Sequence, residues 1–529
     1  MAFVITQNCC KDASCVPACP VDCIRPLDDS TDMLFIDPDT CIDCGACVDE
    51  CPVDAIHYED DLPPEQLGFQ QINAEYFRHH PLEPATVAAP AKHAPVVPGA
   101  LRVAIVGAGP AACYAAAELV AVDNVEVSVF ERLPTPFGLI RSGVAPDHQN
   151  TKAIVRIFES ALASDRVACY LNVDVGTHIS HEELMAHHHA VIYAVGAPNG
   201  RRLTVPGEDL DGLHSAADFV GWYNGQPDHR LQDIDLTGPR AVIIGNGNVA
   251  LDIGRVLLSD PSSLAGTDIA DHALEALSRS GIREVIIVAR RGLRDAAFSV
   301  GEFLALGHLE GVNIIIEDEV LSPYPVDGLE ESLKLQIARE YAQRPIDSGN
   351  KRLVFRFGLT PTEVIGAQRA AGLRVVPTET SNGDEVIEAS LVVTAVGYRA
   401  DPISGVPYDA ATGVIANDAG RVLGSDGTVV PGVYVTGWVK RGPRGVIGTN
   451  RACAAETVSQ LLADFDDGKL VGDVAGPEAL NTLLARRGLT PLTWQQWQNI
   501  DAEERRRGAE TGRPRMKFVD VAEMLTAAL

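Results

Sequence analysis

Short apolar runs that end in glycine turns dominate the pattern beyond residue 100. The run 101–106 is almost entirely apolar and leads into Gly107, which is typical of a parallel strand buried on both faces. The same pattern recurs, so strands are predicted at 101–106, 125–130, 190–195, 240–244 and 284–289. The first and fourth of these runs each lead into a glycine turn and a helix. Two dinucleotide-binding folds of the α/β class are therefore predicted.

Two later apolar runs, 391–396 and 433–436, predict a return to the first of these folds, with the second fold inserted in it. An excursion between about Ser259 and Gly281 is expected inside the second fold. The tail beyond Gly468 has no clear pattern.

The first 80 residues carry an internal repeat with an offset of 32 positions. In the order of the chain, Cys9, Asp12, Cys15, Cys19 and Pro20 align with Cys41, Cys44, Cys47, Cys51 and Pro52. The stretch from Pro81 to Gly99 is rich in proline and alanine and predicts a semi-extended linker. The expected segments are 1–80 for the repeat, 81–99 for the linker, 100–200 and 391–529 for the first dinucleotide fold, and 201–390 for the second.

Charge and cysteine use narrow the possible functions. The formal charge is −29, and residues 1–80 hold 16 acidic against 3 basic side chains. So acidic a surface repels nucleic acid and anionic lipid, and no export signal or membrane-spanning run is found, so a cytoplasmic location is expected. Nine of the 12 cysteines lie within residues 9–51, which in a reducing compartment indicates metal ligands more than disulfides.

The second repeat, Cys41-x2-Cys44-x2-Cys47-x3-Cys51-Pro52, has the spacing of a bacterial iron-sulfur ligand run. In that pattern the fourth cysteine binds the other cluster, so Cys19 is expected to join Cys41, Cys44 and Cys47 around a 4Fe-4S cluster. A zinc site is the rival interpretation, but it does not explain a fourth cysteine followed by proline in a duplicated frame.

The other cluster is expected on Cys9, Cys15 and Cys51, because Asp12 replaces the middle cysteine. A carboxylate is a harder and weaker ligand for such iron than a thiolate. The cluster is therefore either 3Fe-4S, which we favour, or a labile 4Fe-4S held through Asp12, and a solvated Asp12 is compatible with the first form. Cys10 and Cys23 lie outside the repeat. The segment resembles the seven-iron bacterial ferredoxins, an α+β ferredoxin-like two-cluster fold.

The two glycine turns carry the candidate nucleotide chemistry. Gly107 to Ala112 follows a strand and opens a helix, and Glu131 ends the next strand, where an acid can bind ribose hydroxyls. The second turn, Gly245-Asn-Gly247-Asn-Val-Ala, has a partner strand that ends in Arg290-Arg291. Guanidinium groups at this place suit the 2′-phosphate of NADPH better than the ribose of NAD.

Residues 101 to about 465 resemble the adrenodoxin-reductase-like ferredoxin-NADP reductases. The resemblance lies in two long signatures, which span Pro134 to His148 and Gly437 to Asn450. The whole chain resembles the fusion of a ferredoxin with this reductase known as the FprB type.

The resemblance implies two sets of cofactor-binding residues. FAD is expected at Ala108, Gly109, Pro110, Glu131, Leu139, Trp438, Gly445, Val446 and Ile447. NADP is expected at Arg201, Asn248, Val249, Arg290, Arg291, Glu302 and Gly445, and the second glycine turn itself adds Gly245 and Gly247. His148 and Glu302 are the expected catalytic pair, although Ala305 replaces a second acid that relatives often carry.

The predicted activity is that of an NADPH:ferredoxin oxidoreductase, which passes a hydride from NADPH to FAD and single electrons through the clusters to an external ferredoxin or haem monooxygenase. The acidic N-terminal segment is expected to dock on basic residues near the flavin edge. An electron-input subunit similar to the glutamate synthase small subunit, or a redox sensor, are the alternatives.

Overall fold

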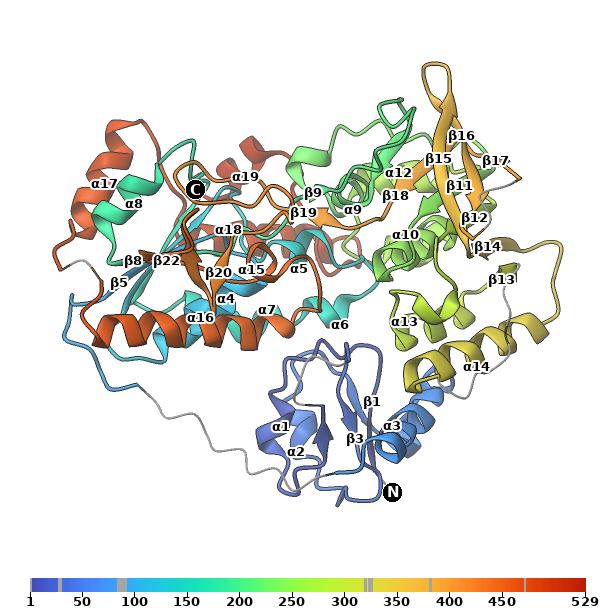
Figure 1. The fold of residues 1–529 in the computed structure, drawn as a ribbon, viewed down its shortest axis with the longest axis horizontal. Helices are drawn as coiled ribbons and strands as arrows, with labels where there is room; N and C mark the ends of the chain where they lie inside the picture. The colour runs from blue at the N-terminus through green and yellow to red at the C-terminus, as the bar shows by residue number, and fades with distance from the viewer. Residues whose placement is uncertain are drawn as a thin grey trace.

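The computed structural model describes residues 2–26, 31–82, 93–317, 321, 327–379, 383–470 and 472–529. Part of the predicted linker, residues 83–92, lies outside this description. Figure 1 shows a small N-terminal unit, defined here as the described part of residues 2–82, beneath a larger two-sheet body that comprises the described residues from 93 onward. None of the described helices combines the length and the apolarity that crossing a bilayer requires.

The N-terminal unit follows the sequence repeat. Its strands pair as β1 (Phe3–Ile5) with β4 (Ile56–Tyr58) and β2 (Ile24–Arg25) with β3 (Phe35–Ile36), both antiparallel. Its helices are α1 (Cys15–Ala18), α2 (Ala46–Asp49) and α3 (Gly68–His79), with 3₁₀ turns η1 (Glu59–Asp61) and η2 (Pro64–Gln66). The buried amide of Asn73 on α3 accepts from Ile36 N at 2.9 Å and donates to Ile5 O at 2.8 Å, which ties α3 to both halves.

The first sheet of the body has the strand order β20-β21-β22-β8-β5-β6-β7. Its five parallel strands are β5 (Arg102–Val106), β6 (Glu126–Glu131), β7 (Val167–Leu171), β8 (Ala190–Tyr193) and β22 (Val429–Val435); β20 (Asn417–Asp418) and β21 (Arg421–Leu423) extend it antiparallel. Apolar side chains of α4 (Pro110–Val120), α7 (Val155–Leu162) and α16 (Thr449–Asp466) cover one face. Those of α8 (His181–His187) and α17 (Pro477–Arg486) cover the other.

The second sheet is entirely parallel, in the order β10-β18-β11-β12-β14-β13. Its strands are β10 (Leu213–Ser215), β11 (Arg240–Ile244), β12 (Glu284–Val288), β13 (Val312–Glu317), β14 (Lys351–Arg356) and β18 (Leu391–Thr394). An antiparallel sheet of β15 (Leu359–Gly366), β16 (Ala370–Pro377) and β17 (Glu385–Glu388) packs on one face. The predicted excursion contains α11 (Pro261–Ala265) and α12 (Asp271–Ser278).

The remaining elements complete the two dinucleotide folds of the body. They are α5 (Leu139–Ser142), α6 (Gln149–Lys152), α9 (Ala216–Asn224), α10 (Asn248–Leu258), α13 (Val300–Ala305), α14 (Leu329–Gln343), α15 (Trp438–Arg441), α18 (Trp494–Ala509), α19 (Val521–Ala527), η3 (Pro227–His229), η4 (Leu293–Asp295) and η5 (Leu306–His308). The short pair of β9 (Asn199–Gly200) and β19 (Tyr398–Arg399) joins the two places where the chain passes between the sheets.

One strand assignment made from the sequence is wrong. The run 391–396 was expected in the first sheet, but β18 pairs with β10 and β11 in the second. An apolar run of this kind looks the same in either buried parallel sheet, so the pattern alone does not choose between them. The later run at 433–436 does return to the first sheet, as part of β22 beside β8.

Candidate functional site

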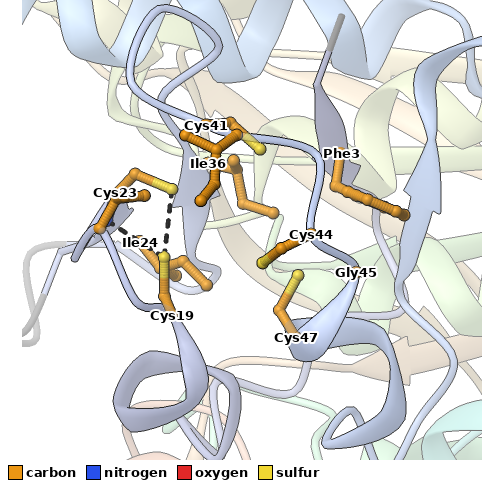
Figure 2. Close-up of a pocket in the computed structure, with 11 residues that line it drawn as sticks. Phe3, Cys19, Cys23, Ile24, Ile36, Cys41, Cys44, Gly45 and Cys47 are labelled. Carbon is orange, nitrogen blue, oxygen red and sulfur yellow. Dashed lines mark hydrogen bonds between the residues drawn. The ribbon is translucent and has the colours of Figure 1, made fainter.

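Four cysteines from both repeats line one cavity of the N-terminal unit. Figure 2 shows Cys19 facing the loop that carries Cys41, Cys44 and Cys47, with Phe3 and Ile36 among the apolar walls. A second cavity is lined by Cys9, Cys15 and Cys51, together with Asp12. The structure therefore brings together the two sets of cysteines that the exchange between repeats predicts.

Cys23 also lines the first cavity, which the repeat did not indicate. Its Sγ lies 3.3 Å from Cys19 Sγ. Cys10 likewise lines the second cavity, and it is also buried against the apolar face of the first sheet.

The backbone of the two cysteine loops repeats as closely as the sequence does. Positive φ angles occur at Lys11 (57°) and Ala13 (65°), and again 32 positions later at Asp43 (55°) and Gly45 (73°). Where left-handed residues alternate with residues of other conformation, successive backbone N–H groups point into one concavity. Such a concavity suits an anionic group, such as a cluster with its sulfides.

Burial makes free thiolates costly in both cavities. It raises the pKa of Cys9 and of Cys47 to about 11, and it raises that of Cys15 further. A thiolate there needs a nearby cation to offset the lost hydration. Bound iron supplies that positive charge, so the donor set and the apolar walls fit iron-sulfur clusters.

The first glycine turn has the geometry of a nucleotide-binding loop. Gly107 adopts φ +103°, and an added Cβ would lie 2.6 Å from Ala194 O. A Cβ added to Gly109 would lie 4.0 Å from its nearest neighbour, Gly138 Cα, so a ligand can approach that backbone. Glu131 accepts from Ala108 N at 2.9 Å, and its burial raises its pKa.

The remaining residues expected near FAD form a connected rim around this turn. Phe137 N donates to Ala108 O at 2.7 Å, which places Gly138 and Leu139 beside the turn. Gly437, which precedes Trp438, packs on Ala111. Farther along, Asn450 Nδ2 donates to Ile447 O at 2.9 Å and so fixes the turn 445–448 that contains Gly445, Val446 and Ile447.

The second glycine turn contains a side-chain donor without a partner among the described residues. Gly245 adopts φ +117° against Ala395 O, and a Cβ on Gly247 would meet open space. The buried Asn246 Nδ2 has no hydrogen-bond partner among the described residues. The side chain of Asn248, next to Val249, accepts from Ser299 N at 2.8 Å, which links the turn to α13.

Three arginines lie where the second nucleotide is expected. Arg290 and Arg291 follow β12 and are exposed, and within the described part of the chain neither guanidinium has a hydrogen bond or an ion pair. Arg201 lies at the crossing between the sheets, where its Nε donates to Tyr398 O at 3.0 Å. Free guanidinium forks at this strand end fit a 2′-phosphate.

His148 and Glu302 come together with Asp252, which the sequence analysis missed. One side-chain atom of each lies within 4.8 Å of the others, and they come from the loop before α6, from α13 and from α10. Burial raises the pKa of Asp252 to about 7, a shift that His148 opposes and Glu302 reinforces. Asp252 lies one helical turn after Asn248, a spacing that could have indicated it.

The buried Arg255 links this cluster across the two dinucleotide folds of the body. It pairs with Asp252 on its own helix and with Asp147, the neighbour of His148. A proton can therefore be held or moved among the acidic and imidazole groups where the two dinucleotide folds meet. The fold and the site together define a two-nucleotide oxidoreductase with an attached iron-sulfur unit.

Comparisons with known proteins agree with this class. Residues 34–57 match the family described as 4Fe-4S binding domain, and residues 101–320 match pyridine nucleotide-disulphide oxidoreductase. The chain is 49% identical over its whole length to a probable ferredoxin/ferredoxin–NADP reductase of Mycobacterium tuberculosis, of which it covers 95%. The solved structure of M. tuberculosis FprA in complex with NADPH matches with a TM-score of 0.76 and 41% identity, over 81% of this chain and 99% of that one. The chain belongs to the ferredoxin/ferredoxin–NADP reductase family.

Proposed function

We propose that this chain is an FprB-type NADPH:ferredoxin oxidoreductase with FAD and two iron-sulfur clusters. The observation that carries the proposal is the union, in one chain, of two cysteine cavities with a body that holds two glycine turns. When bound, FAD takes a hydride from NADPH and the clusters carry single electrons.

The residues of the chain then have distinct tasks. Gly109 and the turn 445–448 hold FAD, Glu131 orients its ribose side, and Asn246 offers its unpartnered amide to NADPH. Cys19, Cys41, Cys44 and Cys47 hold the 4Fe-4S cluster, and Cys9, Cys15 and Cys51 hold the 3Fe-4S cluster. The group of His148, Asp252 and Glu302 sets the protonation of the junction between the nucleotides.

An external ferredoxin is the proposed acceptor, with a haem monooxygenase as a further candidate, and the cytoplasm is the proposed location. A subunit of a larger complex is not favoured, because the full-length relative is itself named a ferredoxin/ferredoxin–NADP reductase. Steady-state oxidation of NADPH by the purified chain, with ferricyanide and then a ferredoxin as acceptor, tests the activity. Turnover with both acceptors supports the proposed activity. If the chain oxidises NADPH with neither acceptor, the proposed activity is contradicted.

Replacing both Arg290 and Arg291 with alanine is expected to raise KM for NADPH by about 10- to 100-fold. This corresponds to a combined loss of about 1.4–2.8 kcal/mol, the worth of one hydrogen bond to a charged group, because both guanidinium groups are exposed and solvent screens their attraction for the phosphate. KM for NADH should change little, because NADH lacks the 2′-phosphate. Arg279→Ala, which removes an exposed arginine paired with Glu275, is the control and should leave both constants unchanged. Equal losses with both nucleotides would contradict a 2′-phosphate site.

A further inference from the structure

Both oxygens of the Asp12 carboxylate accept hydrogen bonds from other side chains. Asp12 is 4% exposed and stands where the second repeat has Cys44. Tyr114 Oη donates to its Oδ2 at 2.5 Å, and the Ser14 hydroxyl donates to its Oδ1. The two oxygens that an iron ion would need are thus already acceptors for hydroxyl groups.

Two partners of Asp12 belong to the body. Tyr114 lies on α4, and Arg451 lies near the start of α16. Arg451 Nη1 donates to Asp12 O at 2.7 Å and lies 3.7 Å from Oδ1. The basic residue expected at this interface is therefore present, and it faces an acid of the first cysteine loop, defined here as residues 9–15.

Backbone atoms meet directly beside this ion pair. Gly448 N donates to Cys10 O at 2.8 Å. A Cβ on Gly448 would lie 2.0 Å from Lys11 O, so the contact leaves no room for a side chain. Gly448 closes the turn 445–448, which places the first cysteine loop on a segment proposed to hold FAD.

A second contact holds the far end of the N-terminal unit. Phe69 of α3 and Gln7 pack on Gly301, where a Cβ would lie 3.4 Å from the Phe69 ring. Gly68 packs against Leu304 in the same way, and both body residues lie on α13 beside Glu302. The charge of the N-terminal segment predicts docking on basic residues and not this apolar contact. Two separate contacts fix the orientation of the unit.

We propose that Asp12 is a docking residue and not an iron ligand: it locks the first cysteine loop on the turn 445–448. The inference rests on the proposed function, because it takes the adjacent cavity to hold a cluster. Three cysteines then remain as ligands there, and the position that is a cysteine in the second repeat serves the contact between the two parts of the chain.

Hydrogen exchange of the full-length, cofactor-loaded protein tests the docking role. Asp12→Ala and Tyr114→Phe are each expected to speed exchange of the Gly448 amide by about tenfold, the effect of one buried hydrogen bond to a charged group. The double variant should add little to either single variant, because both remove the same contact. Amides of β1 and β4 should stay protected, which separates undocking from unfolding.

Matched variants sharpen the result. Asp12→Asn keeps an acceptor for Tyr114 and should restore most of the protection, while Glu65→Gln removes an exposed charge of the same unit and should change nothing. Iron content should be the same in Asp12→Ala as in the unaltered protein. Loss of iron in Asp12→Ala, with no effect of Tyr114→Phe on Gly448, would overturn the proposal and make Asp12 a ligand.

Asp12→Cys offers the cavity a thiolate, which binds such iron more strongly than a carboxylate does. We expect about one additional iron per chain and faster exchange at Gly448, because Tyr114 loses its acceptor and Arg451 keeps only its bond to the main-chain oxygen of residue 12. Four irons in this cavity of the unaltered protein would contradict the proposal. Absence of flavin and of sulfide would instead refute the proposed function, and the exchange of Gly448 would still report on docking.

Discussion

Replacing Cys19 with alanine is expected to abolish the 4Fe-4S cluster that we propose on Cys19, Cys41, Cys44 and Cys47. Cys19 comes from the other repeat, yet it lines the same cavity, and without it one iron corner has no thiolate. The expected result is loss of the 4Fe-4S signal in the EPR spectrum of the reduced protein, with a matching fall in iron and acid-labile sulfide.

Cys23→Ala is the matched control for this experiment. Cys23 lines the same cavity and lies 3.3 Å from Cys19 Sγ, but it has no counterpart in the repeat. It should therefore leave the cluster in place. A cluster that survives Cys19→Ala and is lost in Cys23→Ala would contradict the exchange of ligands between the repeats.

Replacing Asp268 with asparagine is expected to lower the free energy of unfolding by about 3–5 kcal/mol. Asp268 is buried and bonded to two buried ammonium groups, with Lys152 Nζ at 2.7 Å and Lys517 Nζ at 2.9 Å. These residues come from α6, from the loop before α12 and from the segment before α19, so the cluster fastens the two sheets and the tail together. The variant leaves two buried cations without their anion. Thermal denaturation measures the loss.

The pH dependence of the same variant has a defined sign. Burial alone would raise the pKa of Asp268, but Lys152 and Lys517 outweigh it and hold the pKa well below its ordinary value. The stabilisation is therefore complete above the unfolded-state pKa of about 3.9 and is lost as pH falls toward the lower folded-state value. Asp268→Asn should have the largest effect at neutral pH and a smaller one in acid.

Glu275→Gln controls for the loss of an ordinary surface charge. Glu275 and Arg279 form an ion pair with side chains 63% and 76% exposed, so the change should cost less than about 1 kcal/mol. Equal destabilisation by both substitutions would contradict a special role for the buried cluster.

Local patterns predicted the parts of this fold that depend on local geometry. The sequence predicted the strand and glycine turn before α4 and those before α10. A turn that packs against a neighbouring strand admits only glycine, as at Gly107 and Gly245. The repeat predicted which cysteines share a cavity, because duplicated loops fold alike, down to the positive φ angles of Lys11 and Asp43.

Contacts between segments that are distant in the chain could not be predicted from the sequence. Asp252 looks like any polar residue on a helix until the fold brings His148 to it. Glu504 lies in a tail without clear pattern, yet it is fully buried and paired with Arg141. Asp12 could be recognised as an altered ligand position, but its partners Tyr114 and Arg451 lie hundreds of residues apart in the chain and become neighbours through packing of α4 on α16.

Anaerobic titration of the purified chain with NADPH, followed by visible and EPR spectra, tests the central claim most directly. We expect bleaching of a flavin, together with signals from one 3Fe-4S and one 4Fe-4S cluster as electrons enter. A colourless protein, or one that contains zinc and no acid-labile sulfide, would contradict the account.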